Sequence, residues 1–252
     1  MRWCLATISW MLATAACGSE PPADEPPPGG CEGGQLSLVE EECVPVGAAP
    51  ASCAAGFVFD AGGCEPVLPP ASCPPGQLAV PGETECRLVA PCGEGTWGDI
   101  PVDETTHFVD RSYTGGASNG TAEQPWTGIN DAVEAAPPGA LVAIAAGRYQ
   151  EDLYVLKSLR FWGRCPELVE IAGAGVEVGA LDIRGPDSEV HTLAITGPGV
   201  GYVQTTATGV LVDRVWIHDT GSRGVTLQDD FGAPTTEFRG SLIEGSGRGA
   251  AF

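Results

Sequence analysis

The chain has 252 residues, enough for one sizeable domain or for a tail followed by a domain. Its 36 glycines and 22 prolines make up about a quarter of the chain, roughly twice the usual share. This composition excludes a helix-rich fold and favours many short strands joined by tight turns. The formal net charge of -21 argues against nucleic acid as a partner, because phosphates require clustered lysine and arginine. Such acidity fits a solvated surface outside the cytoplasm.

The first 17 residues have the pattern of an export signal. Arg2 gives a positive start, residues 5–16 form an apolar run too short to span a membrane, and small residues precede Cys17. This ending resembles a bacterial lipobox, which implies cleavage before Cys17 and its lipidation. Thr14 departs from the leucine that such boxes favour, so ordinary signal cleavage and secretion is the alternative.

Residues 18–30 form a tether rich in proline, glutamate and glycine that cannot bury a core. An anchor followed by an acidic spacer is the layout of a surface lipoprotein. We therefore expect an exported protein, held by its lipid at the outer membrane or cell surface of a bacterium.

Residues 31–104 contain a repeated cysteine pattern. A Cys-x-x-Gly start recurs about every 20 residues, and a second cysteine closes each of the three units after 12, 11 and 13 residues. Units this short have no core, so a covalent staple is what would hold each one. A fourth start has no nearby partner, which leaves the last cysteine of the chain to pair with it. The predicted disulfides are Cys31–Cys43, Cys53–Cys64, Cys73–Cys86 and Cys92–Cys165.

Zinc is the rival interpretation of these cysteines. It needs Cys-x-x-Cys pairs or Cys/His ligands at close spacing, and these cysteines offer none. The three histidines, His107, His191 and His218, all lie outside residues 31–104. The pattern therefore favours a disulfide-stapled stem.

A short helix and a series of short strands follow the stem. Residues 105–111 alternate like a strand, and a loop over residues 112–124 leads to Thr127, the predicted N-cap of the helix. The apolar residues of the helix fall at i, i+3, i+4 and i+7: Ile129, Ala132, Val133 and Ala136. Further strands are predicted over residues 140–145, 153–156 and 158–162. Because no crossover helices fit between them, the strands cannot form a βαβ sheet, whereas a coil that stacks strand on strand in parallel can be built from them.

This segment resembles the N-terminal capping segment of the pectin lyase-like superfamily and, more narrowly, an uncharacterised bacterial family of right-handed β-helix proteins. The features that carry the resemblance are, in chain order, Asp110, Asn119-Gly120-Thr121, Pro125-Trp126-Thr127, the short helix, Pro138-Gly139, Val142, Gly147-Arg148-Tyr149 and Glu151. Gly128 is a departure, because a better helix former is expected there. The resemblance covers about residues 107–252 and implies an all-β right-handed parallel β-helix, a solenoid whose open end the helix covers.

The later part of the chain repeats at the period of such a coil. The strand cores at Ile195, Ile217 and Ile243 are 22 and 26 residues apart, too close for propeller blades of about 40 residues or more. We place the β-helix at residues 105–252. Solenoids need terminal caps, and Phe252 follows directly after a glycine turn, so we expect the native chain to continue.

Candidate site residues come from the resemblance to polysaccharide lyases of the superfamily, which use calcium-binding carboxylates and a basic residue on one outer face. The residues of this kind are Asp182, Arg184, Asp187, Asp213, Arg214, Asp219, Asp229 and Asp230. We single out Asp182, Asp213, Arg214 and Asp219 as catalytic candidates. Asp213, Asp229 and Asp230 are the calcium candidates, and calcium is the only cofactor considered. The alternative is that these residues are solvated turn residues, and that His191 and His218 are structural.

Two functions remain open on the sequence. The first is a non-enzymatic surface protein that presents a flat binding face to carbohydrate or another surface polymer. The second is a lyase or glycoside hydrolase with part of its active site in coils beyond Phe252. The roughly three coils visible in the sequence contain no complete catalytic set, which favours the first.

Overall fold

The computed structural model describes residues 35–37, 43–45, 52–60, 63–175, 178–229 and 232–251. The chain divides into two compact units, which are described separately. The first comprises Met1–Cys53 and Phe59–Glu65, and the second comprises Ala54–Val58 and Pro66–Phe252.

The upstream strands form small antiparallel hairpins, as expected of a stapled stem. They are β1 (Gln35–Ser37), β2 (Cys43–Pro45), β3 (Phe57–Asp60), β4 (Gly63–Pro66), β5 (Gln77–Leu78) and β6 (Arg87–Leu88). They pair as β1–β2, β3–β4 and β5–β6. Three predicted disulfides are confirmed: Cys53–Cys64, Cys73–Cys86 and Cys92–Cys165. The predicted Cys31–Cys43 bond and the lipidation of Cys17 involve residues outside the described ranges.

Most of the second unit consists of three parallel sheets, called here sheets I, II and III. Sheet I contains, in pairing order, β20 (Thr236–Arg239), β17 (Val210–Asp213), β14 (Glu189–His191), β11 (Arg160–Gly163), β8 (Leu141–Ile144) and β7 (His107–Val109). Sheet II contains β21 (Leu242–Glu244), β18 (Trp216–Thr220), β15 (Ala194–Gly197), β12 (Val169–Ala172) and β9 (Gly147–Tyr149). Sheet III contains β10 (Leu153–Val155), β13 (Gly179–Ile183), β16 (Val200–Gln204), β19 (Arg223–Leu227) and β22 (Arg248–Ala251).

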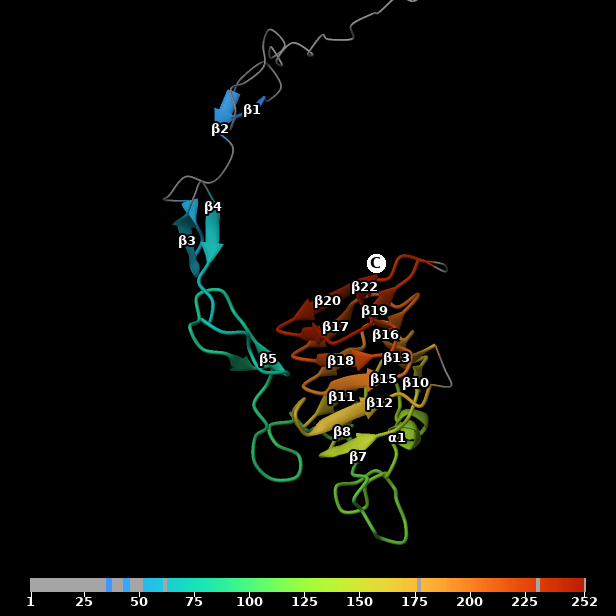
Figure 1. Ribbon diagram of the computed structural model, residues 1–252. Coiled ribbons are helices and arrows are strands. Elements are labelled where there is room, and N and C mark those ends of the chain that lie inside the picture. Colours follow the sequence, from blue (N-terminus) through green and yellow to red (C-terminus); the bar gives the residue numbers. More distant parts are fainter. Residues whose placement is uncertain are drawn as a thin grey trace, which may run out of the picture. The chain divides into compact units, whose positions relative to one another are not determined.

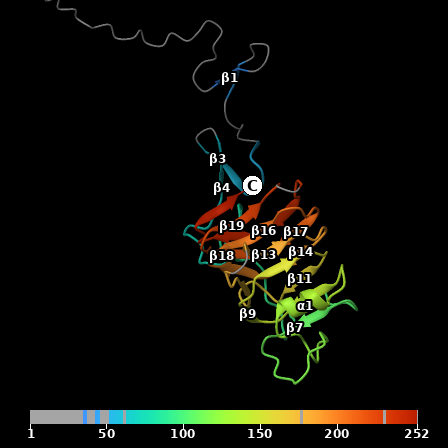
Figure 2. The same ribbon diagram turned by 90° about the vertical axis from the view of Figure 1, so that its right-hand side faces the viewer.

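The chain visits these sheets in rotation. From β8 onward each strand pairs with the strand three later, so the described residues complete five three-strand repeats (Figures 1 and 2). The predicted alignment of Ile195, Ile217 and Ile243 is confirmed by the register, which adds Ile171 below Ile195. The sequence suggested only about three coils. The strands of the first repeats are short, and their isoleucines do not recur at as regular a spacing as those of the later repeats.

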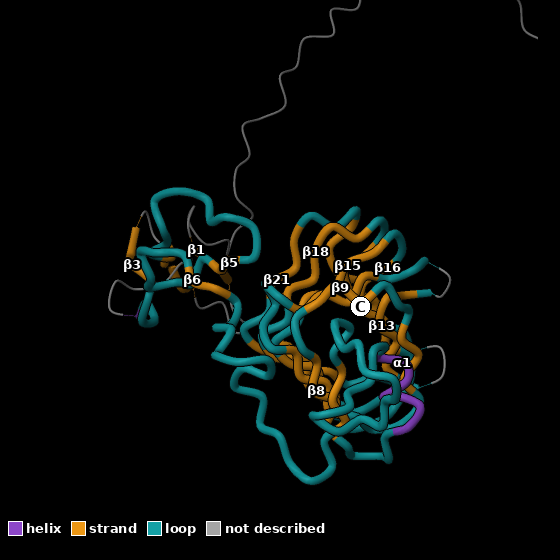
Figure 3. The backbone as a smooth tube through the Cα atoms, turned by 90° about the horizontal axis from the view of Figure 1, so that it is seen from below, coloured by secondary structure: helices purple, strands orange, loops and turns teal. Residues whose placement is uncertain are grey.

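The three sheets lie around one shared interior (Figure 3). The core draws buried side chains from all three sheets, among them Phe161 of sheet I, Ile195 of sheet II and Leu181 of sheet III. Each is fully buried, and burial of such a side chain stabilises the folded state by about 1.5–3 kcal/mol. The parallel strands are therefore held together by a continuous apolar core as well as by their hydrogen bonds.

The single described helix, α1 (Ile129–Ala135), lies at the end of the stack where the chain enters, in contact with β7, β8 and β10 (Figures 1 and 2). Its apolar stripe is confirmed, with Ile129, Ala132 and Val133 buried. The prediction that Thr127 caps the helix is wrong. Gly128 is the N-cap residue, and no side chain beside it in the sequence caps the first turn.

The cap of α1 comes from farther along the chain. The carboxylate of Glu151 accepts hydrogen bonds from the backbone N–H groups of Ile129 and Asn130, each at 2.9 Å. A Cβ atom on Gly128 would lie 3.3 Å from the nearer Glu151 oxygen, which is tighter than usual. Glycine at position 128 therefore leaves room for the carboxylate.

Replacing Glu151 with alanine should lower the free energy of unfolding by about 1–2 kcal/mol, because two helix donors lose their acceptor. Urea denaturation followed by circular dichroism measures the change. Glu134→Ala on the exposed face of the same helix is the matched control, with an expected effect within about 0.5 kcal/mol. An equal loss in both variants would contradict the long-range cap.

The second half of the stem, from Pro66 onward, belongs to the same compact unit as the sheets. The Cys92–Cys165 disulfide joins the two, and Arg160 forms a 2.7 Å salt bridge with Asp103. Hydrogen bonds from Thr105 and Arg160 lower the pKa of Asp103. These contacts between distant residues hold the second half of the stem against the sheets.

Candidate functional site

The outer face of sheet II contains a polar hollow. Arg148, Glu170, Ala194 and Trp216 are in register on four neighbouring strands. Ala194 is small whereas its neighbours are large, so a hollow of about 320 Å³ lies above it. His218, two residues beyond Trp216 on β18, also lines this hollow. The hollow is therefore built by one small residue within a row of long side chains.

The charged groups of the hollow are connected. The Glu170 carboxylate forms a salt bridge with Arg148, and its other oxygen lies 3.5 Å from Nε2 of His218. The second ring nitrogen of His218 lies 3.0 Å from the Asp219 carboxylate. The imidazole also stacks on the Trp216 ring, with 3.8 Å between centroids and 21° between planes. His218 is thus oriented by a carboxylate at each nitrogen and by an aromatic ring on one face.

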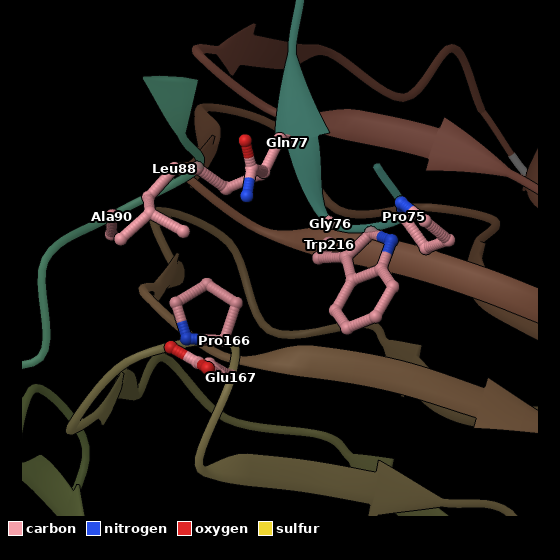
Figure 4. Close-up of a pocket in the computed structure, with 9 residues that line it drawn as sticks. Pro75, Gly76, Gln77, Leu88, Ala90, Pro166, Glu167 and Trp216 are labelled. Atoms are coloured by element: carbon pink, nitrogen blue, oxygen red, sulfur yellow. The ribbon is translucent and has the colours of Figure 1, made fainter. Parts of the chain in front are cut away.

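A second crevice, of about 150 Å³, adjoins the hollow and shares Pro166, Glu167 and Trp216 with it. Figure 4 shows Pro166 and Glu167 on one side of this crevice and Trp216 with Gly76 on the other. Stem residues, including Leu88, form its remaining wall. The two spaces together make a groove that runs from the stem onto sheet II.

The carboxylate of Glu244 links the stem to sheet II beside the crevice. A single oxygen of Glu244 accepts hydrogen bonds from the Trp216 indole at 2.8 Å and from the backbone N–H of Gly76 at 2.7 Å. Gly76 has φ of +75°, and a Cβ there would lie 3.4 Å from the Trp216 ring. The left-handed backbone and close approach favour glycine at this position. The stem therefore covers part of Trp216.

The structure places Asp182, one of the predicted catalytic residues, on sheet III. It is 3% exposed and forms a 3.0 Å salt bridge with Arg184, whose guanidinium carbon lies 5.0 Å from the centroid of the Tyr154 ring. The hydrogen bonds to Asp182 raise the pKa of Arg184. Asp187 occupies a turn with φ of +52°. Asp182 and Arg184 are therefore an ion pair on sheet III, and neither of them lines the hollow on sheet II.

Asp213 lies on sheet I beside one other candidate, Arg214, and beside His191. Its carboxylate is 3.0 Å from Nε of Arg214 and 3.3 Å from Nδ1 of His191. His191 also contacts Glu189 at 2.9 Å and stacks on Trp162 with 3.9 Å between ring centroids. With its ring 6% exposed, His191 is held on several sides within sheet I.

The predicted carboxylates do not gather on one face. Asp182, Asp213 and Asp219 lie on sheets III, I and II respectively. Asp229 follows β19, and Asp230 lies outside the described residues. Within the described parts of the chain, no group of three His, Cys, Asp or Glu side chains is placed to hold a metal ion.

The sequence analysis missed Arg148, Glu167, Glu170 and Trp216 as site residues. A usable signal was present in the alignment of Ile195 with Ile217, because the residues before them, Ala194 and Trp216, then share one outer row. Extending that row to Glu170 and Arg148 required the register of two further strands. The repeat period therefore predicts that Ala194 and Trp216 share an outer row. That Glu170 and Arg148 belong to the same row could be seen only in the structure.

The described residues define a disulfide-bonded, mostly β protein with parallel sheets and one short helix. Comparison with protein-family models, with curated proteins and with solved structures found no match for the chain. None of the helices in the described ranges is long and apolar enough to cross a membrane.

Proposed function

We propose that this chain is an extracytoplasmic surface lipoprotein whose sheets form a right-handed parallel β-helix that binds carbohydrate without cleaving it. The rotation of the chain through three sheets supports the solenoid, and the N-terminal resemblance supports its hand and superfamily. The disulfides support an oxidising compartment. Anchoring at a bacterial outer membrane or cell surface rests on the lipobox-like residues that end at Cys17.

The hollow above Ala194 is the observation that carries the binding proposal. Carboxylates such as Glu170 accept hydrogen bonds from sugar hydroxyls, the Arg148 guanidinium donates them, and the imidazole of His218 donates or accepts them. Trp216 adds an apolar wall, and a few convergent polar groups within a concave surface are typical of a ligand site. A sugar chain lying across β9, β12, β15 and β18 would contact each of these side chains.

Filling the hollow tests this proposal. Ala194→Leu should weaken binding of the best ligand at least about tenfold, because the added side chain occupies the ligand's space. The titration uses the full chain and a panel of neutral, amino and acidic oligosaccharides, followed by calorimetry. Ala174→Leu, at an exposed loop position, is the matched control and should bind normally. Absence of binding across the panel, or unchanged binding by Ala194→Leu, would refute the proposal.

A lyase or hydrolase is the second candidate, and the contact between Glu170 and His218 favours it. Carboxylate and imidazole side chains are common general acids and bases. This alternative predicts new sugar ends when the full chain is incubated with its ligand, with or without calcium, and their loss in Glu170→Gln. The binding proposal predicts intact ligand in every sample.

A further inference from the structure

We infer that the groove on sheet II selects polymers of amino sugars whose amines are free ammonium groups. This inference rests on the proposed carbohydrate-binding function and names its ligand class. The groove runs from the hollow above Ala194 to the crevice beside the stem, and its charged side chains determine which ligands it can take.

Every cationic side chain that lines the groove in the described residues already has an anionic partner. Arg148 is paired with Glu170. His218, when protonated, faces Glu170 at 3.5 Å and Asp219 at 3.0 Å. The groove thus has no spare cation to receive a carboxylate or sulfate from a ligand.

Glu167 is different, because its carboxylate forms no salt bridge with any described residue. It lines both the hollow and the crevice, and Figure 4 shows it beside Pro166 in the crevice. A ligand cation placed there would gain a carboxylate partner without breaking an existing ion pair. The chain's net charge of -21 adds a long-range attraction for cations and a repulsion for anions.

Neutral, acidic and cationic sugars are therefore expected to differ in affinity. Acidic sugars meet an unpaired carboxylate and no free cation, and neutral sugars gain only hydrogen bonds. An amino sugar adds an ammonium that Glu167 can bind, while its hydroxyls use the same groups as a neutral sugar. Charge complementarity favours the cationic form.

The test compares β-linked glucosamine oligosaccharides with their fully N-acetylated counterparts of equal length, using calorimetry on the full chain. The free amines should bind about two- to fivefold more tightly, and high salt should remove this preference. Glu167→Gln should abolish it, so that the free and the acetylated forms bind this variant with equal affinity. Glu123→Gln, an exposed acidic residue in the loop before α1, should keep the preference.

The outcomes separate this inference from the proposed function. Equal affinity for both forms, with binding still lost in Ala194→Leu, would overturn the amino-sugar inference alone. An equal effect of Glu123→Gln and Glu167→Gln would also overturn it, because the attraction would then be non-specific. If neither form nor any other sugar bound, the proposed function itself would fail. Glu167 is exposed, and circular dichroism establishes that its variant folds.

Discussion

Removal of the Cys92–Cys165 disulfide should lower the free energy of unfolding of the second unit by roughly 4 kcal/mol. The bond spans 73 residues and closes the longest covalent loop in the described chain. In the chain-entropy model, a loop of this length restricts the unfolded ensemble by about that amount. Without the bond, the stem would be held to the sheets only by contacts such as Arg160 with Asp103. The variant is Cys92→Ala with Cys165→Ala, measured by urea denaturation.

The matched control is the double alanine variant of Cys53 and Cys64. These residues lie in the first unit and close a loop of only 11 residues. The unfolding transition of the second unit should therefore shift by less than about 0.5 kcal/mol. If both variants shifted that transition equally, Cys92–Cys165 would have no special role in joining stem and sheets.

Phe161→Ala should cost about 3–5 kcal/mol, because it leaves a cavity in the shared interior. Phe161 is fully buried and lies in register between Val142 and Val190 of the neighbouring strands. Loss of its ring should loosen the first repeats and the end near α1. Urea unfolding gives the energy, and hydrogen exchange shows where protection falls.

Phe57→Ala provides the same substitution at an exposed site. Phe57 lies on β3 and is 36% exposed, so its replacement should change stability by less than about 1 kcal/mol. A small effect at Phe161 would mean that the interior is loosely packed. That result would contradict a single continuous core shared by all three sheets.

Several features of the fold could be predicted from local sequence. The spacing of Ile195, Ile217 and Ile243 gave the true register of three repeats. The repeated Cys-x-x-Gly pattern predicted the local disulfides correctly, because the two cysteines of each bond lie only 11 or 13 residues apart in the sequence. In both cases a short repeated pattern carried the information.

Other features depend on contacts between distant residues. The helix cap is Glu151, 22 residues after Ile129, so the search for a local cap settled wrongly on Thr127. The hollow arises because Ala194 stands in register with larger side chains on adjacent strands, which no single strand reveals. Aspartates were favoured by analogy with lyases, although the charged residues that line the groove on sheet II are Glu167, Glu170 and Arg148.

The most direct test of the account is hydrogen exchange of the full chain with and without its tightest-binding oligosaccharide. The account predicts new protection in β9, β12, β15 and β18 and in the segment that carries Glu167, with none in Ala194→Leu. Protection centred on Asp213 in sheet I, or on Asp182 in sheet III, would contradict it. So would binding that left the amides of sheet II unprotected.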